Sequence, residues 1–234
     1  MKIGLLGGTF DPIHFGHIRP SLAVKSQLGL DKIWLMPNAI PPHKKQSVTP
    51  SNHRAAMVNL VCDSYPEFAL CDIEINTKSN TNLHGEKGLS FQPSYTVNTL
   101  LSLQNQHPEH HFTFIMGADS LLNLQQWYQW QKILTLCHIA VCNRPNWSFD
   151  LPALPALIRS RLCPSPHNAM HHIKIGRISL LNVPPQAFSS TEIRTALSQL
   201  SSPTKTISNK QRNFLQMALP KNVLDYIDQH KLYQ

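Results

Sequence analysis

An eleven-residue segment near the start of the chain, Gly7-Gly8-Thr9-Phe10-Asp11-Pro12-Ile13-His14-Phe15-Gly16-His17, constrains the fold most strongly. It follows directly on the apolar run Ile3-Gly4-Leu5-Leu6, which is short and ends at glycines. Such a run is typical of a buried parallel strand. The pattern therefore predicts a strand that opens into a phosphate-binding loop, with a helix starting near His17.

The glycines and histidines of this segment suit a nucleoside triphosphate. Gly7 and Gly8 have no side chains, so the backbone can turn sharply and a ligand can approach its N–H groups. His14 and His17 are three residues apart and can lie on one side of the helix entrance, near its free N–H groups and positive dipole end. A lone histidine or a Gly-Gly turn is ordinarily structural, but the two in this order indicate a site for anionic oxygen.

The segment resembles the signature of the HxGH nucleotidyltransferases, which join a nucleotide to a phosphate-bearing acceptor. What this resemblance implies is an α/β fold of the Rossmann-like type, with an open, mostly parallel sheet and helices on both faces. We expect residues 1–234 to form a single nucleotidyltransferase domain with a C-terminal helical cap from about residue 189.

Composition narrows the class of partner. The formal net charge of +8 and the pI near 9.4 favour anionic partners, but no basic run is longer than Lys44-Lys45, so small phosphates fit better than nucleic acid. No apolar run approaches the ~20 residues that cross a bilayer, so no membrane association is predicted. Five cysteines without a CxxC pair indicate free thiols in a reducing compartment, and we expect a cytoplasmic protein. Oligomeric state is not predicted.

Apolar patterns and turn residues predict alternating strands and helices. The expected strands are 3–6, 32–37, 68–75, 112–116, 138–142 and 173–183. The expected helices are 17–28, 54–62, 97–106, an irregular 121–136, 156–162, and a helical region from about 189 through 227. Thr49 is expected to cap the second helix, with Pro50 at its first position. The polar segment 76–92 is either a mobile lid or a surface loop.

Polar side chains follow several predicted strands at their carboxyl ends, where open α/β sheets bind ligands. Asn38, His43 and Lys44 follow the second strand and should lie on the same rim as the histidines, although an exposed basic loop is the alternative. Thr96 opens a helix whose free N–H groups could bind a carboxylate, or it is an ordinary cap. Asp119 either caps the next helix or accepts from ribose hydroxyls.

Ser189 and Glu192 have the spacing of a capping box at the start of a later helix. Hydroxyls, free N–H groups and Arg194 together at that helix start would make a second anion site.

Trp127, Tyr128 and Trp130 form an aromatic cluster, which is more typical of core than of a ligand platform. A metal cluster of Cys163, His167, His171 and His172 is disfavoured, because prolines at 164 and 166 interrupt any helix that would bring these side chains together.

Later motifs occur in the order found in bacterial nicotinate-nucleotide adenylyltransferases. They are Pro41-Pro42-His43-Lys44, Pro93-Ser94-Tyr95-Thr96, Gly117-Ala118-Asp119-Ser120, Trp127-Tyr128, Asn143-Arg144-Pro145 and Ser189-Ser190-Thr191-Glu192-Ile193-Arg194. This resemblance implies transfer of AMP from ATP to nicotinate mononucleotide, which gives deamido-NAD and pyrophosphate. The alternatives are an adenylyltransferase that prefers nicotinamide mononucleotide and a catalytically silent nucleotide-binding module.

The same resemblance implies roles for individual residues. The catalytic residues would be His14, His17 and Arg194. The ATP-binding residues would be Gly7, Gly8, Thr9, Phe10, His14, His17, Gly117, Asp119, Ser190, Thr191 and Arg194. The residues that bind nicotinate mononucleotide would be Thr9, Asn38, His43, Lys44, Thr96, Trp127 and Tyr128. Mg²⁺ would be held mainly by ATP phosphates, with no metal site of protein carboxylates.

Overall fold

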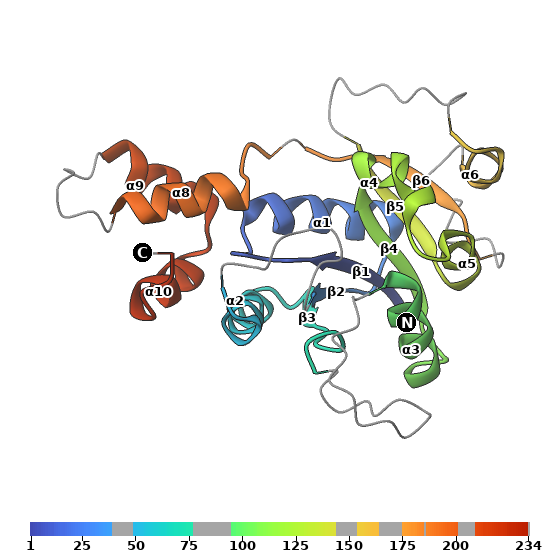
Figure 1. Ribbon diagram of the computed structural model, residues 1–234, viewed down its shortest axis with the longest axis horizontal. Coiled ribbons are helices and arrows are strands. Elements are labelled where there is room, and N and C mark those ends of the chain that lie inside the picture. The colour runs from blue at the N-terminus through green and yellow to red at the C-terminus, as the bar shows by residue number, and fades with distance from the viewer. Residues whose placement is uncertain are drawn as a thin grey trace. The chain divides into compact units, whose positions relative to one another are not determined.

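A computed structural model of the chain describes residues 1–38, 49–76, 95–143, 154–163, 175–184, 186–200 and 209–233. All the predicted strands are present, and two of them are shorter than expected (Figure 1). The strands are β1 (Lys2–Gly8), β2 (Lys32–Pro37), β3 (Phe68–Leu70), β4 (His111–Gly117), β5 (His138–Asn143) and β6 (Ile178–Asn182).

The six described strands form one sheet in the order β3-β2-β1-β4-β5-β6. Strand β4 pairs in parallel with β1 and with β5, and β5 pairs in parallel with β6. This order is that of the Rossmann-like fold, whose strand order reverses between the first and fourth strands. The predicted fold class, an open and mostly parallel sheet with helices on both faces, is confirmed.

Helices alternate with the strands and then follow the last strand. They are α1 (Phe15–Leu28), α2 (Ser51–Ser64), α3 (Thr96–Gln106), α4 (Ala118–Leu122), the 3₁₀ turn η2 (Leu124–Gln126), α5 (Trp130–Leu136), α6 (Ala156–Arg161), α8 (Ser190–Leu200), α9 (Asn209–Ala218) and α10 (Lys221–Gln229). Helix α1 ends as its sequence predicts: Gly29 has a φ of +58°, and the N–H of Leu30 donates to the carbonyl of Lys25 at 3.0 Å.

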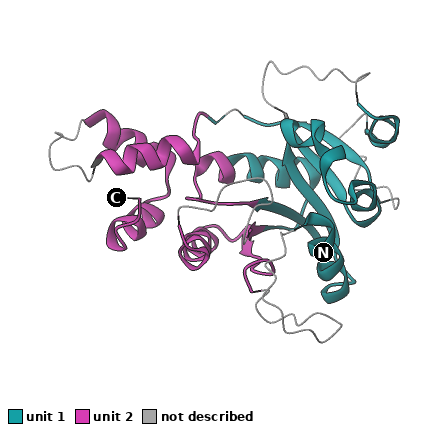
Figure 2. Cartoon of the chain, viewed as in Figure 1, with its two compact units in different colours: residues 1–7, 19–34, 95–186 teal, residues 8–18, 35–94, 187–234 magenta. Residues whose placement is uncertain are grey.

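The chain divides into two compact units, each assembled from separate parts of the sequence (Figure 2). Unit 1 comprises residues 1–7, 19–34 and 95–186, and unit 2 comprises residues 8–18, 35–94 and 187–234. The helical region after residue 189 thus belongs to the same unit as the loop after β1. The prediction of a single domain with a helical cap remains a prediction.

The core of unit 1 consists of side chains on its parallel strands. Ile3 and Leu5 of β1, Phe112 of β4, and Ile139 and Val141 of β5 are buried. Strands β1, β4 and β5 are buried at consecutive positions, as expected for a parallel sheet covered on both faces. Burial of apolar surface contributes about 25 cal/mol per Å² removed from water. This sheet holds the carboxyl ends of β1 and β4 in place.

Strand β3 is shorter than predicted, because the chain leaves the strand geometry after Leu70. The N–H of Ile75 donates to the carbonyl of Asp72 at 2.9 Å, and the side-chain amide of Asn76 donates to the Asp72 carboxylate. Local hydrogen bonds of this kind compete with a strand ladder. The predicted strand over 68–75 is therefore wrong beyond its third residue.

Two other boundaries differ from prediction. Strand β6 begins at Ile178, because Gly176 has a φ of +90°, which is incompatible with a strand; residues 173 and 174 of the predicted strand lie outside the described residues. Helix α2 begins at Ser51 with Pro50 as its N-cap and no side-chain cap, so the predicted Thr49 cap is wrong.

Residues 77–94, which contain most of the predicted loop 76–92, lie outside the described residues. Within the described parts of the chain, no helix is long and apolar enough to cross a membrane.

Candidate active site

The loop after β1 turns at an aromatic residue and not at its glycines. Strand β1 continues through Gly8, and the left-handed position is Phe10, with a φ of 47°. The Phe10 ring is buried and covers Gly8, where an added Cβ would lie 2.9 Å from it. Gly8 is thus needed for this close approach, and the predicted sharp turn at Gly7-Gly8 is corrected to a turn at Phe10.

His14 and His17 lie together, as the sequence predicts. Their ring centroids are 3.9 Å apart, and the edge of the Phe10 ring faces His17 at 5.1 Å. The N–H of Gly16 donates to Nδ1 of His14 at 3.0 Å, and the N–H of His14 donates to Nδ1 of His17 at 3.4 Å. Since Nδ1 accepts in both rings, each ring carries a proton on Nε2. Both imidazoles are therefore donors at Nε2.

Gly16 is required by the packing of His14. A Cβ on Gly16 would lie 2.7 Å from Cε1 and Nδ1 of the His14 ring and 2.9 Å from the carbonyl oxygen of Phe188. A backbone carbonyl cannot move aside as a flexible side chain can. The glycine between the two histidines is therefore a steric requirement of the pair.

His14 is kept neutral by its surroundings. The residue is 3% exposed, and burial lowers the pKa of its imidazole from 6.5 to about 4, against the opposing attraction of the Glu192 carboxylate. A neutral ring that already accepts at Nδ1 can only donate through Nε2. The site is thus built to donate hydrogen bonds without adding a positive charge at His14.

The start of α8 is fastened to the loop by two side chains. The hydroxyl of Ser190 donates to the carbonyl of Pro12 at 3.1 Å, and Nη1 of Arg194 donates to the carbonyl of Asp11 at 2.7 Å. Nη2 of Arg194 also donates to the hydroxyl of Thr191 at 3.3 Å. The structure therefore brings the predicted second anion site, at the α8 start, against the histidine loop.

The predicted capping box at this helix is confirmed. The N–H of Glu192 donates to the Ser189 hydroxyl at 3.2 Å, and the N–H of Ser189 donates to the Glu192 carboxylate at 3.2 Å. The Ser189 hydroxyl donates to the same carboxylate at 2.7 Å. These bonds satisfy end groups of the helix and fix where α8 begins.

A buried polar network beneath the loop was not predicted. Arg54 of α2 is 1% exposed and donates from Nη1 to the carbonyl of Thr9 at 2.7 Å and from Nε to that of Thr49 at 3.2 Å. The Tyr233 hydroxyl donates to the Asp11 carboxylate at 2.7 Å. Burial lowers the pKa of Arg54 and raises that of Tyr233. In the sequence, the one local indication of this network was that Arg54 stands three residues before the apolar stretch that starts at Met57. No local pattern indicated a role for Tyr233.

Asn38 lies beside the loop at the end of β2. Its N–H donates to the carbonyl of Gly8 at 3.0 Å, while its buried side-chain oxygen has no hydrogen-bond partner among the described residues. An unpartnered buried amide is costly unless a ligand completes it. His43 and Lys44, predicted on the same rim, lie outside the described residues.

The aromatic cluster in unit 1 is not core. Tyr128 is 51% exposed, and Trp127 and Trp130 are partly exposed. The Tyr128 ring lies 4.8 Å from that of Tyr95, which is the N-cap residue of α3. Thr96 is the first residue of α3 and not its cap, so its N–H has no partner within the helix. The expectation of a core cluster is therefore wrong for these residues.

The Trp127 ring packs against a residue of the sheet. The ring meets the Phe114 ring of β4 edge to face, with centroids 6.0 Å apart. The backbone N–H of Trp127 donates to the carbonyl of Leu124 at 3.0 Å. Asp119 stands in the first turn of α4 without capping it, and its Oδ1 occupies the space of a Cβ on Gly117. The predicted Asp119 cap is thus wrong, and its carboxylate lies over the glycine that ends β4.

The remaining predictions concern metals and thiols. His167, His171 and His172 lie outside the described residues, so the disfavoured cluster with Cys163 stays untested. All five cysteines are free; Cys71 and Cys137 are buried, and burial raises the pKa of Cys71 to about 11. The Cys71 thiol is therefore protonated at neutral pH.

Comparison with known proteins agrees with this architecture. Residues 5–196 match the family described as cytidylyltransferase-like. A probable nicotinate-nucleotide adenylyltransferase of Shewanella frigidimarina is 45% identical over 236 residues, covering the whole of both chains. One from Shewanella woodyi is also 45% identical, over 235 residues and again the whole of both chains.

Solved structures share the fold at low sequence identity. Nicotinic acid mononucleotide adenylyltransferase of Plasmodium falciparum, complexed with NaAD, superposes with a TM-score of 0.65 at 19% identity and covers 99% of this chain and 97% of its own. The same enzyme complexed with APC gives a TM-score of 0.64, with 99% and 96% coverage.

Proposed function

The chain belongs to the nicotinate-nucleotide adenylyltransferases within the cytidylyltransferase-like family, and on this basis we propose that it transfers AMP from ATP to nicotinate mononucleotide. The products are deamido-NAD and pyrophosphate, in a step of NAD synthesis. The observation that carries this proposal is the His14–His17 pair with both Nε2–H donors set, held in one unit with the Arg194-bearing start of α8.

No protein nucleophile is needed for this reaction. A phosphate oxygen of nicotinate mononucleotide attacks the α-phosphorus of ATP, a new P–O bond forms, and the bond to the pyrophosphate oxygen breaks. Catalysis is then positioning and stabilisation of developing charge. His14 and His17 donate from Nε2 to the α-phosphate, and because their Nδ1 atoms are already bonded, they need no reorganisation as charge develops.

The start of α8 supports a role for its residues with the leaving group. Arg194 presents a guanidinium held by the Asp11 carbonyl, and Ser190 and Thr191 lie in the first turn, where free N–H groups attract anions. We assign the β- and γ-phosphates of ATP to these three residues. Gly7, Gly8 and Phe10 shape the loop that approaches the nucleotide.

The other nucleotide contacts rest on the two units separately. In unit 1, Gly117 and Asp119 receive the ATP ribose, supported by the carboxylate that lies over Gly117. Trp127 stacks on the pyridine ring, supported by its partial exposure, and the N–H groups of Thr96 and Tyr128 bind the nicotinate carboxylate. In unit 2, the residues assigned to the phosphate of the acceptor are Thr9, Asn38, His43 and Lys44. The buried side-chain oxygen of Asn38, which has no hydrogen-bond partner among the described residues, supports this assignment.

Nucleotidyltransferases of this kind use a divalent metal with ATP, and we assign Mg²⁺. The histidine loop has a single carboxylate, Asp11, which accepts from Tyr233. This arrangement favours Mg²⁺ held by ATP oxygens and water, where it neutralises phosphate charge. The five free cysteines support a cytoplasmic location.

The test is pyrophosphate release from ATP and Mg²⁺, measured in parallel with nicotinate mononucleotide and nicotinamide mononucleotide. We expect strong release with the acid, a product with the mass of deamido-NAD, and weak release with the amide. His17→Ala is the control for background release.

Each other outcome decides against part of the proposal. Equal release with both acceptors would show that the Thr96 and Tyr128 N–H groups do not discriminate the acid from the amide. Release only with the amide would make the chain a nicotinamide mononucleotide adenylyltransferase. ATP binding without release with either acceptor would indicate a silent nucleotide-binding module.

A further inference from the structure

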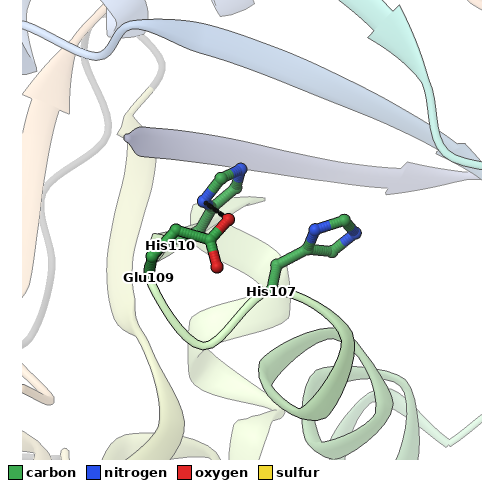
Figure 3. Close-up of side chains that lie close together, drawn as sticks. All are labelled: His107, Glu109 and His110. Carbon is green, nitrogen blue, oxygen red and sulfur yellow. Dashed lines mark ion pairs between the residues drawn. The ribbon is translucent and has the colours of Figure 1, made fainter.

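A cluster of two histidines and a glutamate lies at the turn between α3 and β4, in unit 1. Figure 3 shows His107, Glu109 and His110 projecting to one side of this turn, with the Glu109 carboxylate beside the His110 ring. One ligand atom from each residue lies within 4.8 Å of the others. None of the three takes part in the proposed reaction.

The turn holds the two imidazoles in place. The N–H of His110 donates to the carbonyl of His107 at 3.0 Å, and the N–H of His107 donates to that of Leu103 in α3 at 2.9 Å. The two rings lie 5.2 Å apart and nearly parallel, and the Trp34 ring packs against both, at 5.0 and 5.7 Å. The histidines are therefore ordered before any ligand binds.

His110 carries an unsatisfied ligand atom. Its Nδ1 is shielded from solvent and lies 2.7 Å from Oε1 of Glu109, but it has no well-aligned hydrogen-bond partner among the described residues. A metal ion satisfies the lone pair of Nδ1 and the carboxylate at once. The Glu109 side chain is 63% exposed and can swing to meet an ion from solvent.

We propose that His107, Glu109 and His110 form a binding site for a divalent transition metal of the Zn²⁺ class. Imidazole and carboxylate ligands suit Zn²⁺, and three protein ligands leave a fourth position for water. Ligands about 2.0–2.1 Å from a tetrahedral Zn²⁺ are roughly 3.3 Å apart. No two ligand atoms of the cluster are more than 4.8 Å apart, so any pair must close by at most about 1.5 Å, and the 2.7 Å separation of Glu109 and His110 must open slightly. Glu109 can adjust to an ion without disturbing the packed histidines, because its side chain is exposed.

The site is separate from the nucleotide chemistry. The cluster adjoins His111 at the amino end of β4, whereas Gly117 and Asp119 lie at and after its carboxyl end, about 20 Å away along a seven-residue strand. A metal here joins the end of α3 to the turn before β4 and stabilises unit 1. It does not act on the reacting phosphates.

The test uses the full chain, freed of metal by chelator dialysis, with ZnCl₂ titrated by calorimetry and bound metal counted by equilibrium dialysis. We expect the wild type to bind one more equivalent of Zn²⁺ than the double variant His107→Ala/His110→Ala. At a hundredfold excess over the dissociation constant, Zn²⁺ should raise the Tm of the wild type by about 5 °C or more and leave that of the double variant unchanged.

Two further variants keep the test decisive. Glu109→Gln changes an exposed side chain with little risk to folding and should weaken Zn²⁺ binding at least tenfold. His111→Ala removes the neighbouring exposed histidine outside the cluster and should bind as the wild type does. The same number of equivalents in the double variant and the wild type, unchanged affinity in Glu109→Gln, or equal loss in His111→Ala would overturn the proposal.

Discussion

The histidine loop after β1 and the aromatic segment after α4 are both candidate ligand-binding regions, but they differ in how firmly the chain holds them. In the loop, His14 is buried, and its neighbours are fixed by hydrogen bonds from Arg54, Arg194 and Ser190. In the aromatic segment, Tyr128 is half exposed, and Trp127 is partly exposed and packs edge to face on Phe114.

This difference matches what each region is proposed to do. Donors aimed at developing charge contribute most when they are preorganised and dry, because they then need no reorganisation in the reaction. A pyridine ring needs an open aromatic face for stacking, which gives affinity without chemistry. Substitutions in the loop should therefore change kcat, and those in the aromatic segment should change the KM of the acceptor.

The largest effect is expected for His17→Ala. This change removes one of the two Nε2–H donors at the α-phosphate, and the loss of such a donor lowers kcat by about 10²-fold or more. Steady-state pyrophosphate release measures it, with circular dichroism to establish folding. A folded variant with near-normal kcat would remove His17 from the mechanism and weaken the contrast between the regions.

The pH dependence of the free energy of unfolding tests whether the His14 ring is shielded from water. The unfolded chain protonates His14 near pH 6.5, whereas the folded protein does so near pH 4, so the unfolded state binds more protons between these values. The stability from burying a neutral ring is therefore present above about pH 6.5 and lost as the pH falls to about 4, by about 3 kcal/mol.

Urea unfolding at several pH values between 4 and 7 measures the slope of the free energy of unfolding against pH. The variant His14→Gln should lose most of it, and the exposed-position control His111→Gln should keep it. If the slope were the same in wild type and His14→Gln, the His14 ring would be better hydrated than its burial indicates.

Trp127→Ala tests the open region. Loss of a stacking face should weaken the binding of nicotinate mononucleotide by about 1–3 kcal/mol. The expected result is a higher KM for the acceptor and an unchanged KM for ATP. Trp130→Ala, which removes a partly exposed tryptophan of the same segment, is the matched control and should leave the acceptor KM unchanged. An unchanged acceptor KM in a folded Trp127→Ala would show that stacking occurs elsewhere.

The smallest effect is expected for Tyr233→Phe, which asks how far the loop depends on the network beneath it. Without the hydroxyl, the Asp11 carboxylate loses a 2.7 Å hydrogen bond next to the carbonyl that holds Arg194. One hydrogen bond contributes about 1 kcal/mol, so kcat should fall roughly fivefold with little change in the KM of ATP.

Tyr226→Phe is the control for a purely structural role of Tyr233. The Tyr226 hydroxyl lies 2.9 Å from Nδ1 of His53, so this variant loosens α10 from α2 without touching the loop. Equal losses of stability in both variants, with kcat unchanged in both, would make Tyr233 a structural residue only.

Local rules explain why much of the fold could be predicted. The apolar run before Gly7, the Gly29 cap of α1 and the Ser189–Glu192 capping box are each decided by neighbouring residues. The ends of β3 and β6 could not be predicted in this way. They depend on where side-chain hydrogen bonds or a positive φ interrupt a ladder that apolar alternation would continue.

The sequence by itself determined the loop, its two histidines and the order of strands and helices, because glycine spacing, apolar periodicity and capping act over a few residues. Only the tertiary structure decided that Arg54 and Tyr233 lie beneath the loop, that Phe10 and not a glycine makes its turn, and that the aromatic cluster is exposed. Those features join residues up to 222 positions apart, and such contacts depend on how buried polar groups find partners once the chain is packed.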